Sequence, residues 1–438
     1  MLKLVSFDGY CIDSRNGVIM EVRIIDMDHK GNGIGRINNK IVFIPKGITG
    51  DLVDIEIVKS HRNYDEGRIL KITQSSVDRI DSLCPYYDIC GGCNISNLCY
   101  TKQLEYKKDK IVNIFKRYLG MEIDPVIIGS NNRYEYRNKI TYRCVNGKLG
   151  LVSIDNDLVE IDRCYLVSDK VNELYEIISK EDLSWVDKVI IKECNNGLIL
   201  GIYGNVDINN GDSIDNLCFN NKNISYLIDS IKDMCLSIYV NGICVCKNND
   251  GYIYIGDLKY RVSLNSFFQV NTDNISRMYD VIVKYGDFCK NDRVIDLYCG
   301  VGSISLYVSR YVKSVLGIEI INDAINDAKE NALLNGIDNV DFICGDVSKL
   351  VDDNVDGNKI IVDPPRTGLD NHTIDVLNEI DVDRLIYVSC DVMTLVRDLK
   401  KLDKYEIKDI TLVDMFSQTH HVECVLVLHR KNFKNKDF

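Results

Sequence analysis

The stretch Val294–Leu306, "VIDLYCGVGSISL", decides the fold of the C-terminal part of the chain. An apolar run ends in a glycine turn at Gly300 and Gly302, and a helical pattern begins directly after the turn. The glycines let the backbone approach a ligand closely, and a helix N-terminus lies just beyond. Many nucleotide-binding sheets share this strand, turn and helix, so the motif needs support from the surrounding sequence.

Strand-like runs alternate with helical runs from about residue 292 onward. They read "RVIDL", "SVLGIE", "VDFIC", "KIIVD" and "RLIYVS", and the last one reads "VECVLVL". This alternation of strands and helices is typical of an α/β protein with a doubly wound, mostly parallel, Rossmann-like sheet. We therefore predict that such a sheet occupies residues 258–438.

Three acids follow successive strands of this predicted sheet: Glu319, Asp346 and Asp363. Open α/β sheets bind ligands at the carboxyl ends of their strands, where Glu319 suits ribose hydroxyls and Asp346 could meet an adenine. Each acid alone is better explained as a solvated loop carboxylate, but together with Gly300 they favour an adenosine cofactor. Ser305 stands where a dinucleotide site needs its third glycine, so S-adenosylmethionine, which has no phosphate, suits the turn better.

The sharpest constellation is Asp363-Pro-Pro-Arg366, then Ser389-Cys390, then His421-Val-Glu423. Two of the chain's five prolines form a stiff, extended turn directly after a buried strand. A cysteine at a strand end beside a cofactor crevice is a candidate nucleophile, although such a thiol taken alone is more often structural. Glu423 lies in an apolar strand, where burial would raise its pKa and suit it to act as a base.

These two residues fit the methylation of carbon 5 of uracil, which is a poor nucleophile. A thiolate that adds to carbon 6 makes carbon 5 electron-rich, and carbon 5 can then attack a sulfonium methyl group. A base must afterwards remove the carbon 5 proton so that the thiolate can leave. The sequence thus predicts Cys390 as the nucleophile and Glu423 as the base. The target nucleotide would have to leave its stack to reach them.

Short alternating strands with glycine-rich turns fill residues 17–75, after an N-terminal extension at residues 1–16. This pattern predicts a small OB-like β-barrel, which could bind RNA or serve as an interaction barrel without such a ligand. A cysteine-rich loop and a central α+β domain are predicted for residues 76–257. Within that range, apolar and basic residues recur at helical spacing over residues 100–119.

Cys84, Cys90 and Cys93 have the spacing C-x5-C-x2-C, and Cys164 lies far downstream. Thiolates gathered on a glycine-rich loop suit either tetrahedral zinc or an iron–sulfur cluster. The spacing alone slightly favours zinc, because zinc sites are commoner. Four free thiols would be the remaining interpretation, and it is more open for Cys164 than for the other three.

The net charge of −12 and the pI of about 5.1 count against a nucleic-acid partner when taken alone. RNA needs only a local basic surface, and basic residues do cluster locally. Each cluster could also be a solvated face; the members are Lys102, Lys107, Lys108, Lys110, Lys116 and Arg117 in one, and Arg133, Arg137, Lys139 and Arg143 in the other. The 17 cysteines could suggest a secreted disulfide scaffold, but the odd count, the length of the chain and the absence of an apolar leader argue against it. No membrane-length apolar run is present, so we predict a cytoplasmic protein and expect it to be a monomer.

The chain resembles the RNA uracil-5 methyltransferases, and most closely their iron–sulfur-containing 23S ribosomal RNA members. The matching motifs are "YEYRNKI", "SFFQVN", "DLYCGVG", "GIE", "NALLNGIDNV", "DPPRTGL", "YVSCDVMTLVRDL" and "VDMFSQTHHVE", in family order over nearly the whole chain. The resemblance implies a class I methyltransferase domain, a TRAM barrel at residues 17–75, and 23S ribosomal RNA as the substrate.

Specific residue roles follow from this resemblance. It implies Cys390 as nucleophile, Glu423 as proton acceptor, and a [4Fe–4S] cluster on Cys84, Cys90, Cys93 and Cys164. The implied cofactor contacts are Gln269, Tyr298, Glu319 and Asp363, with Asp346 near the adenine. Arg397 and Asp398 fall in the matching "RDL" stretch, for which we expect a structural role. "SCDV" replaces the family's usual "SCNP", so we expect a looser turn after Cys390, and Cys99 is extra beside the cluster motif.

Several other functions remain open from the sequence. The same chemistry could act on transfer RNA, a related enzyme could methylate carbon 5 of cytosine, and a degenerate sheet could leave an RNA-binding protein without catalysis. A radical enzyme could also join a TRAM barrel to an iron–sulfur cluster. Its C-x3-C-x2-C motif is absent, and it would leave the "DPPR", "SC" and "HVE" motifs unexplained.

Overall fold

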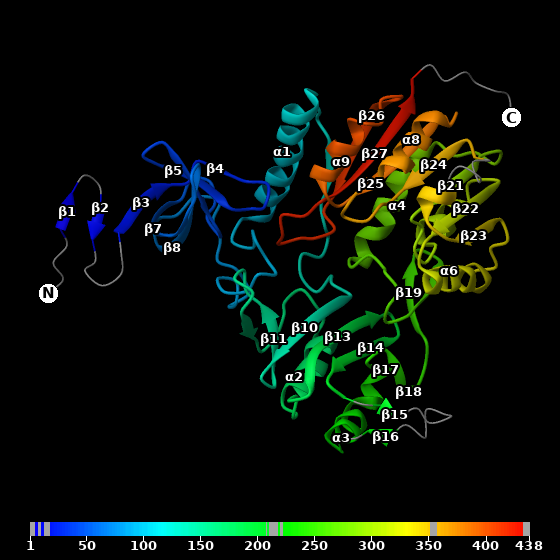
Figure 1. Cartoon of the computed structure of the whole chain (residues 1–438), viewed down its shortest axis with the longest axis horizontal. Coiled ribbons are helices and arrows are strands. Elements are labelled where there is room, and N and C mark those ends of the chain that lie inside the picture. The colour runs from blue at the N-terminus through cyan, green and yellow to red at the C-terminus, as the bar shows by residue number, and fades with distance from the viewer. Residues whose placement is uncertain are drawn as a thin grey trace. The chain divides into compact units, whose positions relative to one another are not determined.

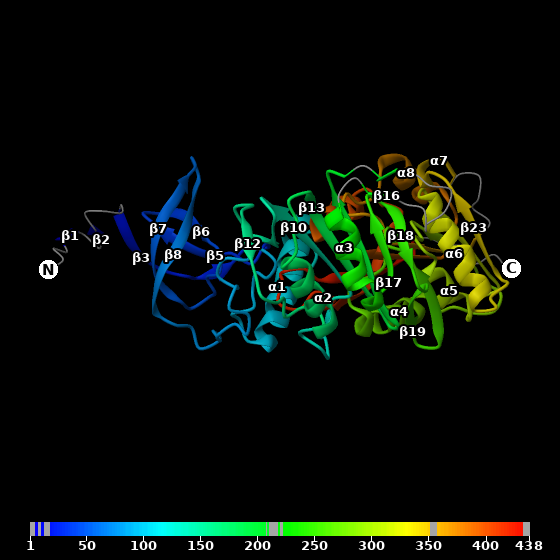
Figure 2. The ribbon, with the colours of Figure 1, turned by 90° about the horizontal axis from the view of Figure 1, so that it is seen from below.

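A computed structural model describes residues 5–7, 10–12, 18–206, 208–209, 218–219, 222–350 and 357–431. The rest of the predicted extension, residues 1–4, 8–9 and 13–16, lies outside the described residues. The chain divides into two compact units (Figures 1 and 2). One unit comprises Met1–Asn113, Val152–Asp157 and Phe416–His421, and the other comprises Ile114–Leu151, Leu158–Met415 and Val422–Phe438.

The first unit is built on an eight-stranded sheet in the order β1-β2-β3-β7-β8-β6-β5-β4. The short strands predicted for residues 17–75 are confirmed. Alternating aliphatic side chains form the core of this sheet, among them Val22, Ile44 and Val53. The strand bounds are β1 Val5–Phe7, β2 Tyr10–Ile12, β3 Val18–Arg23, β4 Asp26–Met27, β5 Gly33–Ile37, β6 Lys40–Ile44, β7 Leu52–Ser60 and β8 Tyr64–Gln74.

The cysteine-rich segment after β8 forms turns rather than regular strands, and helix α1, Tyr100–Leu119, follows it. The predicted helix over residues 100–119 is confirmed. Inside the first unit, the segment Phe416–His421 is tied to α1, because Lys107 donates to the carbonyl of Phe416 at 3.0 Å and Gln103 bonds the side chain of Gln418 at 3.0 Å. Lys107 is fully buried, so this carbonyl satisfies an otherwise costly charge.

The second unit contains a seven-stranded sheet in the order β12-β11-β10-β13-β14-β17-β18, which we call the central sheet. Helix α2 packs on one face of it, where Tyr175 stacks on Tyr142 with the ring centroids 4.4 Å apart. Helix α3 lies beside α2 (Figure 2). The bounds are β10 Lys139–Val145, β11 Lys148–Val152, β12 Leu158–Glu160, α2 Asp169–Ser179, β13 Val186–Cys194, β14 Gly197–Gly204, α3 Lys222–Ile231, β17 Cys235–Val240 and β18 Ile243–Lys247, with a 3-10 turn at Lys232–Met234.

The predicted doubly wound sheet is confirmed as an eight-stranded sheet, β23-β22-β21-β24-β25-β27-β26-β9 (Figure 1). Strands β23, β22, β21, β24 and β25 run parallel, and each pairs with its neighbour in the sheet without a register shift. The bounds are β21 Arg293–Leu297, α5 Ser303–Ser309, β22 Ser314–Glu319, α6 Asn322–Leu334, β23 Val340–Cys344, α7 Val347–Leu350, β24 Lys359–Val362, α8 Asn371–Glu379, β25 Arg384–Ser389, α9 Val392–Leu399, β26 Tyr405–Val413 and β27 Glu423–Arg430.

Two features of this sheet add detail to the sequence prediction. Strand β27 runs antiparallel to both β25 and β26, which is compatible with a mostly parallel sheet. Strand β9, Val126–Ile128, lies in the range predicted for the central domain but pairs with β26 at the edge of this sheet. Helix α4, Thr272–Gly286, packs against β25, β26 and β27. The remaining strands are the pairs β15 Ile208–Asn209 with β16 Cys218–Phe219, and β19 Gly251–Ile255 with β20 Leu258–Val262.

Candidate active site

The register of two antiparallel strands brings Cys390 and Glu423 together. Ser389, the last residue of β25, pairs with Cys424 of β27, so the next position along β25 lies across from Glu423. Residues directly opposite in an antiparallel pair have Cα atoms roughly 4.5–5.5 Å apart. The carboxyl group of Glu423 raises the pKa of Cys390, which agrees with this proximity. The two residues that the sequence singled out therefore face one another.

Asp363 joins this pair from the neighbouring strand. It directly follows β24, which runs parallel to β25 with Val362 paired to Tyr387. Burial and the nearby carboxyl of Asp296 raise the pKa of Asp363 to about 7, while a hydrogen bond from Gln269 opposes the shift. The carboxyl group of Asp363 in turn raises the pKa of both Glu423 and Cys390, in addition to the effect of burial. Three strand ends thus converge on one cluster of acids and a thiol.

The electrostatics of the cluster favour the neutral forms of its members. Burial, Glu423 and Asp363 together raise the pKa of the Cys390 thiol to about 12. Glu423 is only 2% exposed, and burial with Asp363 nearby raises its pKa to about 8. Its Oε2 atom has no hydrogen-bond partner among the described residues. A buried carboxyl with an unsatisfied oxygen and a pKa near neutrality is suited to accept and release a proton.

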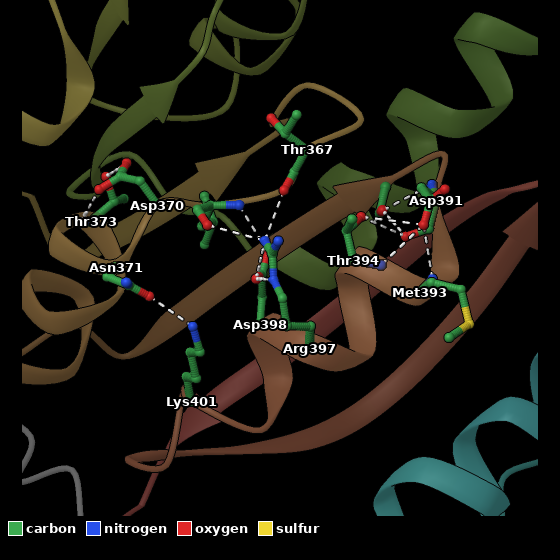
Figure 3. A network of polar contacts seen from close by, with 12 residues as sticks. Thr367, Asp370, Asn371, Thr373, Asp391, Met393, Thr394, Arg397, Asp398 and Lys401 are labelled. Atoms are coloured by element: carbon green, nitrogen blue, oxygen red, sulfur yellow. Dashed lines mark hydrogen bonds and ion pairs between the residues drawn. The ribbon is translucent and has the colours of Figure 1, made fainter.

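The turn after Cys390 is firmly capped (Figure 3). The side chain of Asp391 accepts hydrogen bonds from the backbone N–H groups of Met393 at 2.9 Å and Thr394 at 3.0 Å, and so caps the N-terminus of α9. The expectation of a looser turn at "SCDV" is therefore wrong. Aspartate is among the best N-cap residues.

The predicted structural role of Arg397 and Asp398 agrees with their contacts (Figure 3). Asp398 is completely buried and accepts from the backbone N–H of Leu369 at 2.8 Å and from the hydroxyl of Tyr387 at 2.7 Å. Arg397 bonds Asp398 and also donates to the carbonyl of Thr367 at 2.8 Å. This network ties the loop that follows Asp363 to the helix that follows Cys390.

The glycine turn after β21 contains Tyr298 and Gly300, two of the predicted cofactor residues. The backbone N–H of Gly300 donates to the carboxylate of Glu319 at 3.2 Å, and the N–H of Ile321 donates to the same carboxylate at 2.9 Å. Tyr298 has a φ of 65°, which is uncommon for a non-glycine residue and is typical of a functional turn. Asp346 lies close enough to Tyr298 to raise the pKa of its hydroxyl.

Gln269 reaches the cluster from the loop before α4. Its side chain bonds Asp363, while its carbonyl accepts from the side chain of Asn138 at 2.9 Å. The loop is fixed further by the buried Lys192, which donates to the carbonyl of Ser266 at 2.9 Å. The central sheet thereby positions a residue of the candidate site.

Two residues at the site received no role from the sequence. Arg366 is exposed, and its guanidinium counteracts the raised pKa of both Cys390 and Glu423. Asp296 is completely buried inside β21, where burial raises its pKa to about 7 and Ser305 donates to it at 2.5 Å. A carboxylate inside the apolar run "RVIDL" was the signal that could have identified Asp296, because such a buried charge is costly.

The cysteine-rich loop of the first unit gathers around one lysine. The ammonium of Lys46 donates to the carbonyls of Cys93 at 2.6 Å and Cys90 at 3.1 Å. Cys84 and Cys90 also influence one another electrostatically. Within the described part of the chain, however, no three His, Cys, Asp or Glu side chains converge as metal ligands do. Cys164 belongs to the other unit, so the predicted four-cysteine site stays a prediction.

Comparison with known proteins agrees with this arrangement. Residues 252–431 match the model of the tRNA (Uracil-5-)-methyltransferase family, and residues 13–70 match the TRAM domain. An RNA methyltransferase of Clostridium acetobutylicum is 32% identical, over 94% of this chain and 96% of the relative. The chain belongs to the RNA uracil-5 methyltransferase family. The family resemblance and the TRAM domain inferred from the sequence are thereby confirmed.

Two further proteins are similar to this chain over most of its length. An RNA methyltransferase of Caldanaerobacter subterraneus is 34% identical, over 94% of this chain and 98% of the relative. The solved Pyrococcus abyssi tRNA (uracil-54, C5)-methyltransferase, in complex with S-adenosyl-L-homocysteine, is 25% identical and superposes with a TM-score of 0.74. The match covers 93% of this chain and 99% of that structure. No helix in the described ranges is long and apolar enough to cross a membrane.

Proposed function

We propose that the chain transfers a methyl group from S-adenosylmethionine to carbon 5 of a uridine in RNA. The observation that carries this proposal is the register of β25 and β27, which sets Cys390 opposite Glu423 beside Asp363. A thiol and a buried carboxyl at one strand edge are the two groups that this chemistry requires. Membership of the uracil-5 methyltransferase family supports the same reaction.

The first step forms a bond between Sγ of Cys390 and carbon 6 of the uracil ring. Because the pKa of Cys390 is raised to about 12, the thiol gives up its proton to solvent water as the bond between Sγ and carbon 6 forms. Arg366 stabilises the thiolate, since its positive charge favours the ionised form. The electron pair of the carbon 5–carbon 6 double bond moves onto the carbonyl oxygen and leaves an enolate with electron density at carbon 5.

Carbon 5 then bonds to the methyl group of S-adenosylmethionine while the sulfur–methyl bond breaks and S-adenosylhomocysteine leaves. Glu423 completes the reaction. The carboxylate of Glu423 removes the proton from carbon 5, the double bond to carbon 6 reforms, and the bond from carbon 6 to Sγ breaks. A carboxylate with a pKa of about 8 is a stronger base than an ordinary one. The raised pKa that burial produces is therefore useful in this step.

The methyl donor supplies an electrophilic methyl group on a sulfonium sulfur. Residues at the carboxyl ends of β21, β22, β23 and β24 would hold it, and their donors and acceptors suit ribose hydroxyls and an adenine ring. The site fits such a molecule because Glu319 is already oriented by two backbone N–H groups. The proposed contacts are Gln269, Tyr298, Gly300, Glu319, Asp346 and Asp363.

We propose 23S ribosomal RNA as the substrate, based on the likeness of the cysteine-rich loop to that of the ribosomal enzymes. Transfer RNA is the second candidate, because the similar Pyrococcus abyssi structure is named as a tRNA enzyme. We expect the protein to act in the cytoplasm as a monomer. Mapping 5-methyluridine in RNA from cells with and without the protein separates the two substrates.

We also propose that Cys84, Cys90, Cys93 and Cys164 hold a [4Fe–4S] cluster. Thiolate donors suit iron, and the first three cysteines lie close enough to Lys46 to act on its pKa. The methyl transfer itself moves no electrons, so no step of the reaction depends on this group. Iron and sulfide analysis of protein purified without oxygen, in the native chain and in Cys84→Ala, tests the proposal.

The proposed reaction is tested by replacing the nucleophile. Cys390→Ala should leave no measurable 5-methyluridine when RNA from cells lacking the protein is incubated with the methyl donor, as measured by nucleoside mass spectrometry. Cys289→Ala is the matched control, because Cys289 is an exposed thiol outside the cluster. Formation of 5-methyluridine by Cys390→Ala, or of 5-methylcytidine by the native chain, would contradict the proposal.

A further inference from the structure

Lys192, on strand β13 in the middle of the central sheet, is a buried lysine that donates to three uncharged oxygens of one turn. The residue is only 1% exposed. Its ammonium donates to the carbonyl of Ser263 at 2.8 Å, to the carbonyl of Ser266 at 2.9 Å and to the hydroxyl of Ser266 at 3.2 Å. An ammonium group has three N–H donors, so these three oxygens satisfy all of them.

A buried charge of this kind costs folding free energy that a hydrophobic side chain of similar size would not cost. Burial and the nearby Lys139 lower the pKa of Lys192 to about 8, which reflects this cost. A lysine at this position therefore indicates that the contacts of its ammonium group have a use beyond filling the core.

The turn at residues 263–266 is a compact unit that moves as one piece with its anchor. The backbone N–H of Ser263 donates to the hydroxyl of Ser266 at 2.9 Å, and that hydroxyl donates to the carbonyl of Ser263 at 2.9 Å. The hydroxyl of Ser263 donates to Asp327 of α6 at 3.2 Å. Leu264 is buried against β14, where a Cβ added at Gly201 would lie 2.6 Å from its side chain. The buried ammonium group thus joins a closed turn to the central sheet.

The chain leads from this turn directly to Gln269, three residues after the turn ends. The carbonyl of Gln269 accepts from the side chain of Asn138 at 2.9 Å, and the carbonyl of Val270 accepts from the backbone N–H of Asn138 at 2.9 Å. Between these two attachments the side chain of Gln269 bonds Asp363. Lys192 on one side and Asn138 on the other therefore determine where this side chain lies.

We propose that Lys192 is a positioning residue for the methyl donor: it fixes the turn at residues 263–266 so that Gln269 reaches Asp363 and both side chains bind the donor. This inference rests on the proposed function, because Gln269 and Asp363 are proposed contacts of that molecule. Lys192 acts through the turn. The central sheet thereby contributes to the affinity for a molecule that the carboxyl ends of another sheet would hold.

Calorimetric titration of the full chain with S-adenosylhomocysteine tests this inference by a double-mutant cycle. Gln269→Ala should weaken binding roughly tenfold, as expected for the loss of one hydrogen bond. Lys192→Met keeps a side chain of similar length without the charge, and should weaken binding by about three- to tenfold because the turn loses its anchor. The double variant should bind within about twofold of Gln269→Ala alone, because both changes remove the same contact.

The matched control is Lys359→Met, because Lys359 is a second buried lysine that donates to backbone carbonyls, those of Gly286 at 2.8 Å and Asp287 at 2.7 Å. It should lower the midpoint of urea denaturation and leave the Kd for S-adenosylhomocysteine within about twofold of the native value. Ser266→Ala removes one acceptor on the side of the turn and should also weaken binding. It carries the test if Lys192→Met does not fold.

The outcomes separate this inference from the proposed function. Unchanged affinity in folded Lys192→Met, or losses that multiply in the double variant, would overturn the inference even if the native chain forms 5-methyluridine. The expected affinities, in a native chain that forms no 5-methyluridine, would support the inference and refute uridine methylation. A native chain that binds no S-adenosylhomocysteine would overturn the inference and the proposed methyl donor together.

Discussion

Two regions of the molecule carry cysteines that the sequence marked for chemistry, and the structure treats them differently. Cys390 lies at the end of β25, where the strand ladder sets Glu423 opposite it and Asp363 beside it. The loop around Cys90 is held by turns and by Lys46, and no three ligand side chains converge there in the described part of the chain. The register of paired strands determines which side chains lie opposite one another. The conformation of a loop instead depends on contacts that the spacing of its cysteines does not reveal.

The largest effect is expected from removing Glu423, the proposed base at the Cys390 site. Glu423→Gln should lower kcat by about 10²–10⁴-fold, because the amide cannot accept the carbon 5 proton. Addition of Cys390 does not need that proton to leave, so the covalent RNA adduct should accumulate with ordinary uridine RNA. Denaturing gel electrophoresis of stopped reactions measures the adduct.

The control for this variant is Glu406→Gln, an exposed acid on β26 that pairs with Lys408. It should turn over like the native chain. If Glu423→Gln retains native kcat, or loses activity without any accumulated adduct, then β27 does not supply the base. The contrast between the Cys390 site and the cysteine-rich loop would then lose its basis.

The network around Asp398 should matter for stability. Asp398→Ala leaves the buried hydroxyl of Tyr387 and the N–H of Leu369 without their acceptor, which should lower the free energy of unfolding by about 3 kcal/mol. Urea denaturation measures the change. Lys401→Ala removes only a surface hydrogen bond to Asn371 (Figure 3) and should change stability by less than about 0.5 kcal/mol. Equal effects of the two variants would contradict the account.

The acidity of Glu423 predicts the pH dependence of kcat/KM. Burial raises the pKa of this carboxyl to about 8, so the base form is the minor species at neutral pH. The rate should therefore rise about tenfold per pH unit below pH 8 and level off above it, because deprotonation creates the active base. A rate that is flat from pH 6 to 9, or that falls as pH rises, would show that this carboxyl does not control turnover.

The smallest effect on methyl transfer is expected at the cysteine-rich loop. The triple variant Cys84→Ala/Cys90→Ala/Cys93→Ala should lose bound iron while kcat changes less than for Glu423→Gln, because the reaction needs no electron from this loop. Colorimetric iron analysis and nucleoside mass spectrometry measure the two quantities on the same preparation. Loss of all turnover in folded protein would place the loop inside the catalytic machinery.

The sequence predicted the parallel strands closely because each is an apolar run with one dominant period. Residues 293–297, 314–319, 340–344 and 384–389 were quoted from the sequence with the bounds that the structure gives them. Strand β9 was missed, since three residues contain no period and their partner β26 lies far away in the chain.

The candidate site divides in the same way. Cys390, Glu423 and Asp363 could be predicted because strand ends of one sheet meet at one edge. The influence of Arg366 on the thiol could not be predicted, since it depends on the path of an exposed loop. The capped turn at Asp391 contradicted a motif-based expectation, because the side chain of Asp391 accepts hydrogen bonds from two backbone N–H groups of α9.

The central claim is that Sγ of Cys390 bonds to the pyrimidine ring. RNA containing 5-fluorouridine at the target position tests this directly, because fluorine at carbon 5 leaves no proton for Glu423 to remove. Intact mass spectrometry should show the native chain bound covalently to methylated RNA, and peptide mapping should place the link on Cys390. The account would be contradicted if the protein formed S-adenosylhomocysteine with uridine RNA as acceptor but formed no adduct with 5-fluorouridine RNA. An adduct that persists in Cys390→Ala would also contradict it.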